Sequence, residues 1–176
     1  MPPSRNRNHR IEKSDRASPQ SPSSHASTSR SSRGSRQNAS GRVFTDVILT
    51  IKPVYAGLIR KREKNHEFRG YRLRAGVQRL WLYESSPVCA LTCLIETAAP
   101  KVPGEICDPS GIGNDEFDAG QSASYAYPIL GLFTLGQPVS RVEMKARFGV
   151  YAPQGYCYAK EQLLTGLPLD VMDRSF

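Results

Sequence analysis

One β-branched stretch decides the predicted fold of this 176-residue chain: Val43-Phe44-Thr45-Asp46-Val47-Ile48-Leu49-Thr50-Ile51-Lys52-Pro53. Its run of Val, Ile and Thr is typical of a mostly buried β-strand over residues 43–51. Pro53 suits the first turn of a following helix, because the N–H that proline lacks would be unpaired there in any case. Tyr55, Leu58 and Ile59 recur at helical spacing, which predicts a helix over residues 54–62.

Downstream of this pair, the sequence predicts further short elements. Strands are expected at 65–73, 77–84, 88–97, 128–135 and, closing the sheet, 150–160. Ser140 and Glu143 have the spacing of a capping box, which predicts a short helix to Phe148 that ends at Gly149. A last helical turn is expected at 161–164. Residues 98–121 are rich in Pro, Gly and Asp and predict a long loop with room for one helical turn.

These elements predict one small α+β domain at residues 42–176, built on a curled sheet or small β-barrel with two or three short helices. Cys89 and Cys93 are four residues apart on an expected strand, so they are predicted on the same side of it. The side chains expected to be buried in the core are Leu49, Ile51, Ile59, Phe68, Leu80, Leu82, Leu91 and Ile129.

The composition of the chain changes near residue 41. Residues 1–41 contain twelve serines and carry eight Lys and Arg against two acidic residues, a net charge of +6. Such a segment cannot bury enough apolar surface to fold, so it is predicted to be a disordered, Ser/Arg-rich basic tail. The chain has no apolar run of 18 residues and no apolar segment near its start, so we expect no membrane span, no secretory signal and an intracellular location, nuclear or cytoplasmic.

Basic residues also gather inside the expected domain. Residues 60–79 contain eight Lys and Arg against Glu63 and Glu67, a net charge of +6. A basic block on a nearly neutral domain predicts a face for a polyanion such as RNA. An ordinary solvated surface is the alternative interpretation.

The sequence offers little for a metal or cofactor site. The four cysteines form no C-x-x-C pair, and His66 is the only histidine outside the tail. We therefore expect no metal and no cofactor, reduced structural cysteines, and a packing role for His66. The acidic residues of the long loop, Asp115, Glu116 and Asp118, lack the spacing of a calcium loop and are expected to be a solvated turn.

A short alternating stretch carries the candidate binding chemistry. Glu67 and Arg69 are two apart on an expected strand and so share a face with Asn65 and Tyr71, whereas Phe68 and His66 point to the other face. A carboxylate such as Glu67 can accept a hydrogen bond from an exocyclic base amine, and Arg69 can bind a phosphate with two hydrogen bonds. The alternative is a structural ion pair within the strand.

The chain resembles the ASCH (activating signal cointegrator homology) domain of the PUA-like superfamily. Three motifs carry the resemblance in the family's order: Ile48-Leu49-Thr50-Ile51-Lys52-Pro53-Val54-Tyr55-Ala56, Glu63-Lys64-Asn65-His66-Glu67-Phe68-Arg69 and Leu82-Tyr83-Glu84-Ser85-Ser86-Pro87-Val88. The resemblance covers residues 44–97 and extends more weakly over 122–160. It implies a small barrel with a cleft, and a role in RNA metabolism as a binder of nucleic acid or a modified base.

The expected binding site combines the motifs with the chemistry of their side chains. Lys52 and Lys64 supply charge for phosphate contacts, and Tyr83 is either a stacking platform for an unpaired base or a partly buried core residue. The predicted nucleic-acid-binding residues are Lys52, Lys64, Glu67, Arg69, Tyr83, Ser85 and Ser86.

The resemblance also implies an enzymatic alternative. One similar bacterial branch removes the acetyl group from acetylcytidine with a Lys before this strand, a Thr on it and a distant Glu. Lys64 matches the Lys, Glu67 occupies the Thr position, and Glu96 is the nearest candidate for the distant Glu. Relatives also carry Gly where this chain has Arg62, at a position that leaves the helix in a left-handed conformation.

Three classes of function therefore follow from the sequence. The first is a module that binds RNA or a modified nucleobase through a basic cleft. The second is a small amidohydrolase that acts on an acylated nucleoside through Lys64 and Glu67. The third is a protein-interaction domain of a transcription or RNA-processing complex. RNA or a modified nucleoside is the expected partner, with a protein partner as the alternative.

Overall fold

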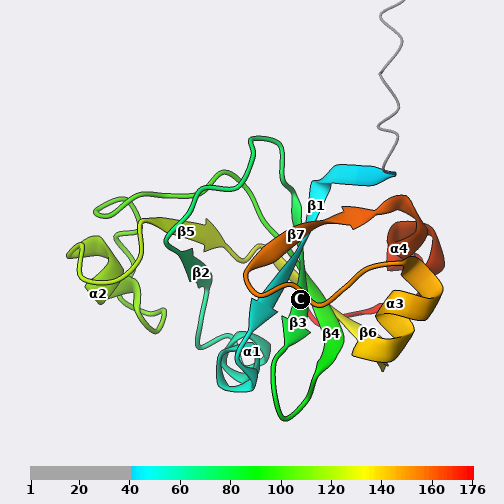
Figure 1. Ribbon diagram of the computed structural model, residues 1–176. Helices are drawn as coiled ribbons and strands as arrows, with labels where there is room; N and C mark the ends of the chain where they lie inside the picture. Colours follow the sequence, from blue (N-terminus) through cyan, green and yellow to red (C-terminus); the bar gives the residue numbers. More distant parts are fainter. Residues whose placement is uncertain (1–40) are drawn as a thin grey trace, which may run out of the picture. The chain divides into compact units, whose positions relative to one another are not determined.

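The computed structural model describes residues 41–176, so the predicted disorder of the tail lies outside the described residues except at Gly41. Eight strands, four α-helices and one 3-10 helix follow in chain order (Figure 1). They are β1 (Arg42–Ile51), α1 (Pro53–Arg60), β2 (His66–Arg69), β3 (Arg79–Glu84), β4 (Ala90–Glu96), α2 (Asn114–Asp118), β5 (Tyr125–Pro128), β6 (Gly131–Ser140), α3 (Arg141–Phe148), β7 (Tyr156–Lys160), α4 (Glu161–Gly166), η1 (Leu169–Val171) and β8 (Asp173–Arg174).

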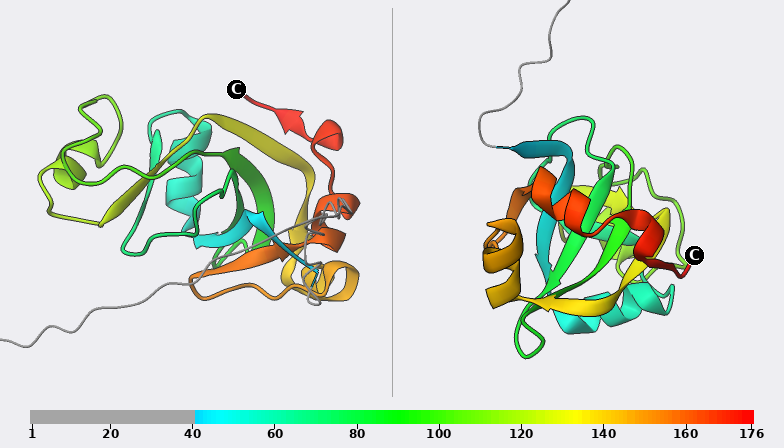
Figure 2. Two further views of the ribbon diagram at one scale, coloured as in Figure 1. Left: turned by 90° about the horizontal axis from the view of Figure 1, so that it is seen from above. Right: turned by 90° about the vertical axis from the view of Figure 1, so that its right-hand side faces the viewer.

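Six strands form the main sheet in the order β7-β1-β3-β4-β6-β8. β1 and β3 are parallel, with Asp46 opposite Arg79 and Ile51 opposite Glu84, and the remaining pairs are antiparallel. The mixture of helices and a mostly antiparallel sheet confirms the predicted α+β class. The sheet curves, but its outer strands β7 and β8 do not pair, so the prediction of a closed barrel is wrong (Figure 2). No helix within residues 41–176 is long and apolar enough to cross a membrane.

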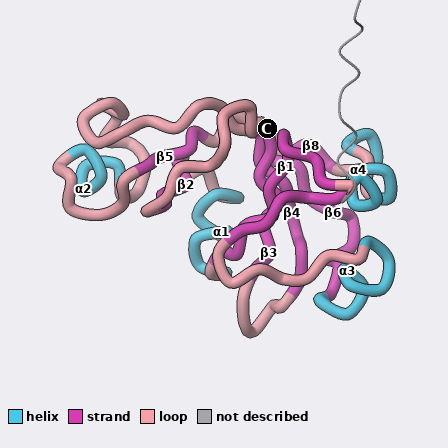
Figure 3. The backbone as a smooth tube through the Cα atoms, turned by 45° about the horizontal axis from the view of Figure 1, so that its top comes forward, coloured by secondary structure: helices cyan, strands magenta, loops and turns pink. Residues whose placement is uncertain are grey.

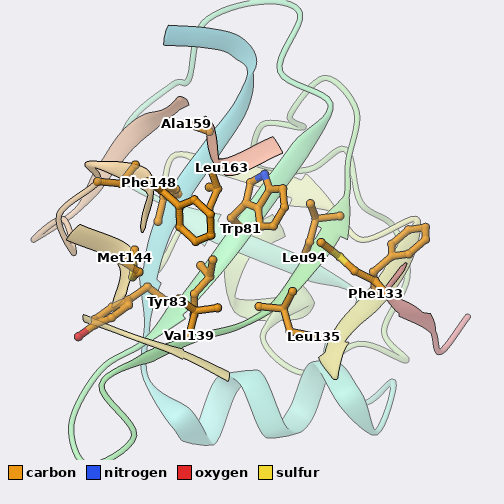
Figure 4. Packing of buried hydrophobic residues seen from close by; sticks show 14 residues of the cluster. Trp81, Tyr83, Leu94, Phe133, Leu135, Val139, Met144, Phe148, Ala159 and Leu163 are labelled. Atoms are coloured by element: carbon orange, nitrogen blue, oxygen red, sulfur yellow. The ribbon is translucent and has the colours of Figure 1, made fainter. Parts of the chain in front are cut away.

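Both faces of the main sheet are buried because its central strands carry apolar side chains on both sides. In β3, Trp81 points to one face, and Leu80 and Leu82 point to the other. The Trp81 face packs against α3 and α4 through Met144, Phe148 and Leu163, as Figure 4 shows. The Leu80 face packs against Ala56 and Ile59 of α1 and against Leu73 and Tyr127.

A smaller unit stands beside the main sheet, which we call the lobe: β2, β5, the loop 98–121 and α2 (Figure 3). β2 and β5 form a two-stranded antiparallel sheet, with Glu67 opposite Tyr127. The lobe has a small apolar cluster of its own, with Ile106, Phe117 and Ala126 buried and Phe68 and Ala123 packed against them.

Most predicted elements are present. The strand at 43–51, its helix, the strands at 77–84 and 88–97, and the terminal helical turn are confirmed within a few residues. The capping box is confirmed in full: the Ser140 hydroxyl accepts from the Glu143 N–H, the Glu143 carboxylate accepts from the Ser140 N–H, and Gly149 ends the helix with a φ of 59°.

Four predictions about local structure are wrong. The strand expected at 128–135 is two strands, because the chain leaves the lobe after Pro128 and joins the main sheet at Gly131. The strand expected at 65–73 ends at Arg69. Cys89 lies before β4 with a φ of 51° and is exposed, so it does not share a side with buried Cys93. Phe68 and Ile129 are only partly buried; the other predicted core residues are buried.

Candidate functional site

The parallel pairing of β1 with β3 requires a crossover connection, and residues 52–78 of this connection carry the candidate site. α1 ends near Arg60, and Arg62 turns the chain into β2 with a left-handed φ of 62°. This conformation costs a residue with a side chain on the order of 1 kcal/mol relative to glycine. The chain thus keeps the turn implied by the resemblance, and the Arg62 guanidinium lies 4.3 Å from the centre of the Phe176 ring.

Two adjoining cavities lie between α1 and β2, and the loop 98–121 lines the first of them. The first has a volume of about 430 Å³ and is lined by Tyr55, Lys64, Glu67, Phe68, Ile112, Gly113, Glu116 and Ser122. The second has a volume of about 370 Å³ and is lined by Thr50, Ile51, Lys52, Tyr55, Glu67, Phe68, Arg69 and Ser85. Because they share three residues, we treat them as one site, the crossover pocket.

Three charged side chains form the centre of the crossover pocket. The Glu67 carboxylate lies 2.8 Å from Arg69 through Oε1 and 3.8 Å from Lys64 Nζ through Oε2. Arg69 also donates to the backbone carbonyl of Thr50 at 2.9 Å, which fixes its orientation. Oε2 of Glu67 is buried and accepts no hydrogen bond from any described residue. An unsatisfied carboxylate oxygen in a cavity is suited to accept a hydrogen bond from a ligand.

The amine of Lys64 is as buried as the carboxylate, since each side chain is only 6% exposed. Burial lowers the pKa of Lys64, Arg69 lowers it further, and the charge of Glu67 opposes the change. Lys64 Nζ also lies 3.9 Å from the centre of the Phe68 ring and 5.7 Å from that of Tyr55. The pocket therefore places one acceptor and one donor beside two aromatic rings.

The loop 98–121 completes the pocket because polar contacts hold it against β2. Asn65 donates to Asp108 at 2.8 Å and accepts from Asn114 at 3.0 Å. Gly113 has a φ of 88°, and a Cβ there would lie 2.9 Å from the Phe68 ring, so glycine allows the close approach. These contacts bring three loop residues to the pocket: Ile112, Gly113 and Glu116. Sequence patterns alone do not indicate their place there.

The acidic turn of the loop is not simply solvated as predicted. Asp118 accepts hydrogen bonds from the backbone N–H groups of Gly104, Ile106 and Cys107, and these bonds lower its pKa. It therefore holds the loop in shape. Glu116 is exposed at the pocket.

His66 is buried in the lobe, in agreement with the packing role predicted for it. Its Nδ1 lies 2.8 Å from Asn65 Oδ1, which also accepts from Asn114, so Nδ1 is the protonated nitrogen. Burial, reinforced by the charge of Lys101, lowers the pKa of His66 to about 4. The imidazole is therefore neutral near pH 7.

The structure brings five of the seven predicted binding residues to the crossover pocket: Lys52, Lys64, Glu67, Arg69 and Ser85. Tyr83 is buried in the cluster on the Trp81 face and lies outside the pocket, in the core role foreseen as its alternative (Figure 4). Ser86 is exposed in the turn before β4 and also lies outside. Glu96 pairs with Arg174 at 3.6 Å and does not line the pocket.

Only half of the basic block of residues 60–79 is exposed without an acidic partner among the described residues. Acidic side chains pair with four of its eight members: Arg60 with Glu84, Lys64 and Arg69 with Glu67, and Arg79 with Asp46. Lys61, Arg62, Arg72 and Arg74 are exposed. No group of three or more His, Cys, Asp or Glu side chains within residues 41–176 is arranged to hold a metal ion.

Comparison with solved structures identifies the fold. The crystal structure of an ASCH protein from Zymomonas mobilis matches with a TM-score of 0.53 at 14% identity, covering 74% of this chain and 98% of that one. Two single-residue variants of that protein, serine to alanine and tyrosine to phenylalanine, match with TM-scores of 0.54 and 0.55 at 14% and 15% identity. They cover 75% and 73% of this chain and 99% of theirs. The chain therefore has the ASCH fold.

Sequence comparison adds no closer relative. No protein-family model matches the chain, and no curated protein matches it.

Proposed function

We propose that the crossover pocket binds a nucleobase that carries an exocyclic amine, as a free nucleoside or within RNA. The observation that carries this proposal is the buried Oε2 of Glu67, which lies 3.8 Å from Lys64 Nζ and has no hydrogen-bond partner among the described residues. An acceptor beside a donor matches the edge of cytosine, where the N4 amine adjoins the N3 acceptor. Adenine presents the same pattern.

The aromatic side chains and the size of the pocket support a base as the ligand. Phe68 and Tyr55 offer apolar ring surface next to the charged centre. Base recognition in single strands commonly combines stacking on aromatic side chains with hydrogen bonds to the base edge. A cavity of about 430 Å³ also falls in the range of small-molecule sites.

The distribution of charge favours recognition of a base over binding of a long polyanion at this site. Arg69 and Lys64 both contact Glu67, so the charged centre carries a net charge of only one positive unit when Lys64 is protonated. Lys52 is exposed at the edge of the pocket, where it can contact a phosphate. One flanking phosphate is therefore expected to strengthen binding.

Binding of cytidine and uridine to the full chain, followed by calorimetry or NMR, tests the proposal. Uridine presents a carbonyl oxygen to Glu67 where cytidine presents an amine, so we expect a preference for cytidine of about 1–3 kcal/mol. Glu67→Gln should abolish this preference because the amide can donate as well as accept. Glu63→Gln removes an exposed carboxylate outside the pocket and should change nothing. Equal binding of both nucleosides by the unmodified protein, or no binding of either, contradicts the proposal.

The lowered pKa of Lys64 favours hydrolysis of an acylated amine as a second candidate function. A neutral Lys64 can take a proton from a water molecule that attacks the acyl carbon. The amide C–N bond then breaks, the nitrogen leaves as the free amine after gaining a proton, and the acyl group leaves as a carboxylic acid.

Release of acetate from acetylcytidine by the full chain distinguishes the two functions. Turnover that disappears in Lys64→Ala but persists in Lys61→Ala establishes hydrolysis, because Lys61 is exposed outside the pocket. Binding of acetylcytidine without turnover leaves recognition as the function.

A further inference from the structure

A second recessed surface lies beyond the crossover pocket, along β7 and the start of α3. Two cavities of about 540 and 510 Å³ share Tyr151 and Ala152, so they adjoin each other. We call this surface the tyrosine face. Its lining residues are Arg42, Arg141, Val142, Lys145, Gly149, Val150, Tyr151, Ala152, Pro153, Tyr156, Cys157, Tyr158 and Lys160.

Aromatic rings on the tyrosine face are open to a ligand. Tyr151 is 65% exposed and Tyr156 is 37% exposed, both large values for aromatic side chains that line a cavity. Tyr156 is held in place because its ring packs against Tyr71 at 4.9 Å and against Tyr158 at 6.0 Å between centres. An exposed ring fixed from behind, as that of Tyr156 is, is a suitable platform for a stacking base.

The charge of the tyrosine face has one sign. Arg42, Arg141, Lys145 and Lys160 line the two cavities, and no acidic residue among 41–176 lines either of them. Lys145 Nζ lies 5.4 Å from the centre of the Tyr151 ring and forms no ion pair with any residue in 41–176. Lys160 donates to the carbonyl of Gly149 at 2.6 Å and so fixes the turn that precedes Tyr151. This arrangement differs from the crossover pocket, where Glu67 opposes the basic groups.

We infer that the tyrosine face binds single-stranded nucleic acid, with bases stacked on Tyr151 and Tyr156 and phosphates contacted by the basic side chains. Exposed aromatic rings among unopposed basic groups are what a flexible strand requires, since every base has a ring to stack and every linkage a negative charge. Binding of an acidic protein surface would use the basic side chains but would not require the exposed aromatic rings. The inference does not depend on the nucleobase proposed for the crossover pocket.

The tyrosine face and the crossover pocket are neighbours but share no lining residue. The Thr50 hydroxyl donates to the carbonyl of Pro153, and the Gly155 carbonyl accepts from the Thr50 N–H at 3.1 Å. Thr50 lines the pocket and Pro153 lines the face. Substitutions at Glu67, Tyr151 and Lys145 leave these two bonds in place, so the two functions are separable by mutation.

Binding of fluorescently labelled oligouridine to the full chain tests the inference, with inorganic polyphosphate as a polyanion that has no bases. Tyr151→Ala is expected to weaken oligouridine binding about 5- to 100-fold and leave polyphosphate binding unchanged, whereas Tyr151→Phe retains a ring and should bind like the unmodified chain. Lys145→Ala should weaken both ligands and reduce the salt slope by about one unit. Lys61→Ala removes the same charge outside the face and is the matched control.

Two results overturn the inference. If Tyr151→Ala and Lys145→Ala bind oligouridine no worse than Lys61→Ala does, the face takes no part in binding. If Lys145→Ala weakens both ligands but Tyr151→Ala weakens neither, the face recognises charge alone and an acidic protein is the better partner. The preference for cytidine over uridine is measured on Glu67→Gln and Tyr151→Ala; its loss in Glu67→Gln but not in Tyr151→Ala keeps the test of the crossover pocket separate.

Discussion

The main sheet and the lobe are stabilised by different interactions. The main sheet buries a large apolar cluster on each face, and its central strands β3 and β4 are almost wholly buried. The lobe buries only Ile106, Phe117 and Ala126 in its own apolar cluster. Its remaining order comes from the polar contacts of Asn65, Asp108 and Asn114 and from the backbone bonds to Asp118.

This difference separates stability from recognition. Apolar burial is the dominant source of folding free energy and does not depend on direction, whereas hydrogen bonds contribute less but fix orientation. The crossover pocket lies where the lobe meets α1, so its walls are positioned by directional contacts. The following predictions test the comparison, from the largest expected effect to the smallest.

Removing a core side chain from the main sheet should reduce the free energy of unfolding more than removing the Phe68 ring from the lobe. Leu80 is fully buried, and Leu80→Ala should reduce the free energy of unfolding by about 2–5 kcal/mol. Phe68→Ala should cost less than this despite the larger side chain, because the Phe68 ring already lines a cavity. Chemical denaturation of both variants measures the difference. Equal losses would show that the lobe is as tightly packed as the sheet.

Removal of the Asn65 side chain should release the lobe without unfolding the sheet. Asn65→Ala removes one hydrogen bond each from Asp108, Asn114 and His66, at a cost of about 1–3 kcal/mol. Hydrogen exchange should accelerate in residues 105–120 and stay unchanged in β3 and β4. Ser110→Ala removes an exposed hydroxyl that contacts Asp108 and is the control. Faster exchange throughout the sheet would contradict the separation.

Acid should weaken the lobe through His66. Its pKa is about 4 in the folded chain and about 6.5 when unfolded, so the unfolded chain binds more protons between these values. The stabilisation is complete above pH 6.5 and is lost as the pH falls towards 4, by roughly 1–2 kcal/mol after allowance for partial solvation. His66→Gln should remove this part of the pH dependence. Identical pH profiles for both proteins would refute the assignment.

The turn that connects α1 to the lobe should carry a small strain. Arg62→Gly relieves the left-handed conformation and Arg62→Ala does not, while both lose the contact with Phe176. The glycine variant should therefore be more stable than the alanine variant by about 1 kcal/mol in thermal or chemical unfolding. If the two variants are equally stable, the strain is absent.

The main sheet is largely predictable from the sequence, and the lobe is not. The strands at 43–51 and 77–84 and the helix capped by Ser140 follow from local patterns that tertiary structure does not override. Residues 128–135 are largely apolar, so their pattern does not indicate that the chain leaves the two-stranded sheet after Pro128 and enters the main sheet at Gly131. The Ile129 N–H bonds to Asn65 in the lobe and the Leu130 N–H bonds to Glu96 in the main sheet, a change that periodicity cannot reveal.

The residues of the candidate site also divide into those that the sequence predicts and those that it does not. Lys64, Glu67 and Arg69 lie within six residues, so strand geometry is enough to predict that the last two act together. Ile112, Glu116 and Ser122 come from the long loop, and their place depends on contacts between Asn65 and the loop more than 40 residues away in sequence. Tyr83 faces the other side of the sheet because it alternates with Leu82 along β3 and so shares the face of Trp81.

The crossover between β1 and β3 is held at both ends by the main sheet, and the side chains that it sends into the pocket lie outside that sheet. The parallel register from Asp46–Arg79 to Ile51–Glu84 fixes where residues 52–78 begin and end. Substitutions at Lys64, Glu67 or Arg69 therefore change the chemistry of the pocket without altering any strand pairing of the main sheet. A fold arranged in this way can acquire a new ligand by changing one short segment while keeping its architecture, which makes this crossover the natural place to engineer specificity.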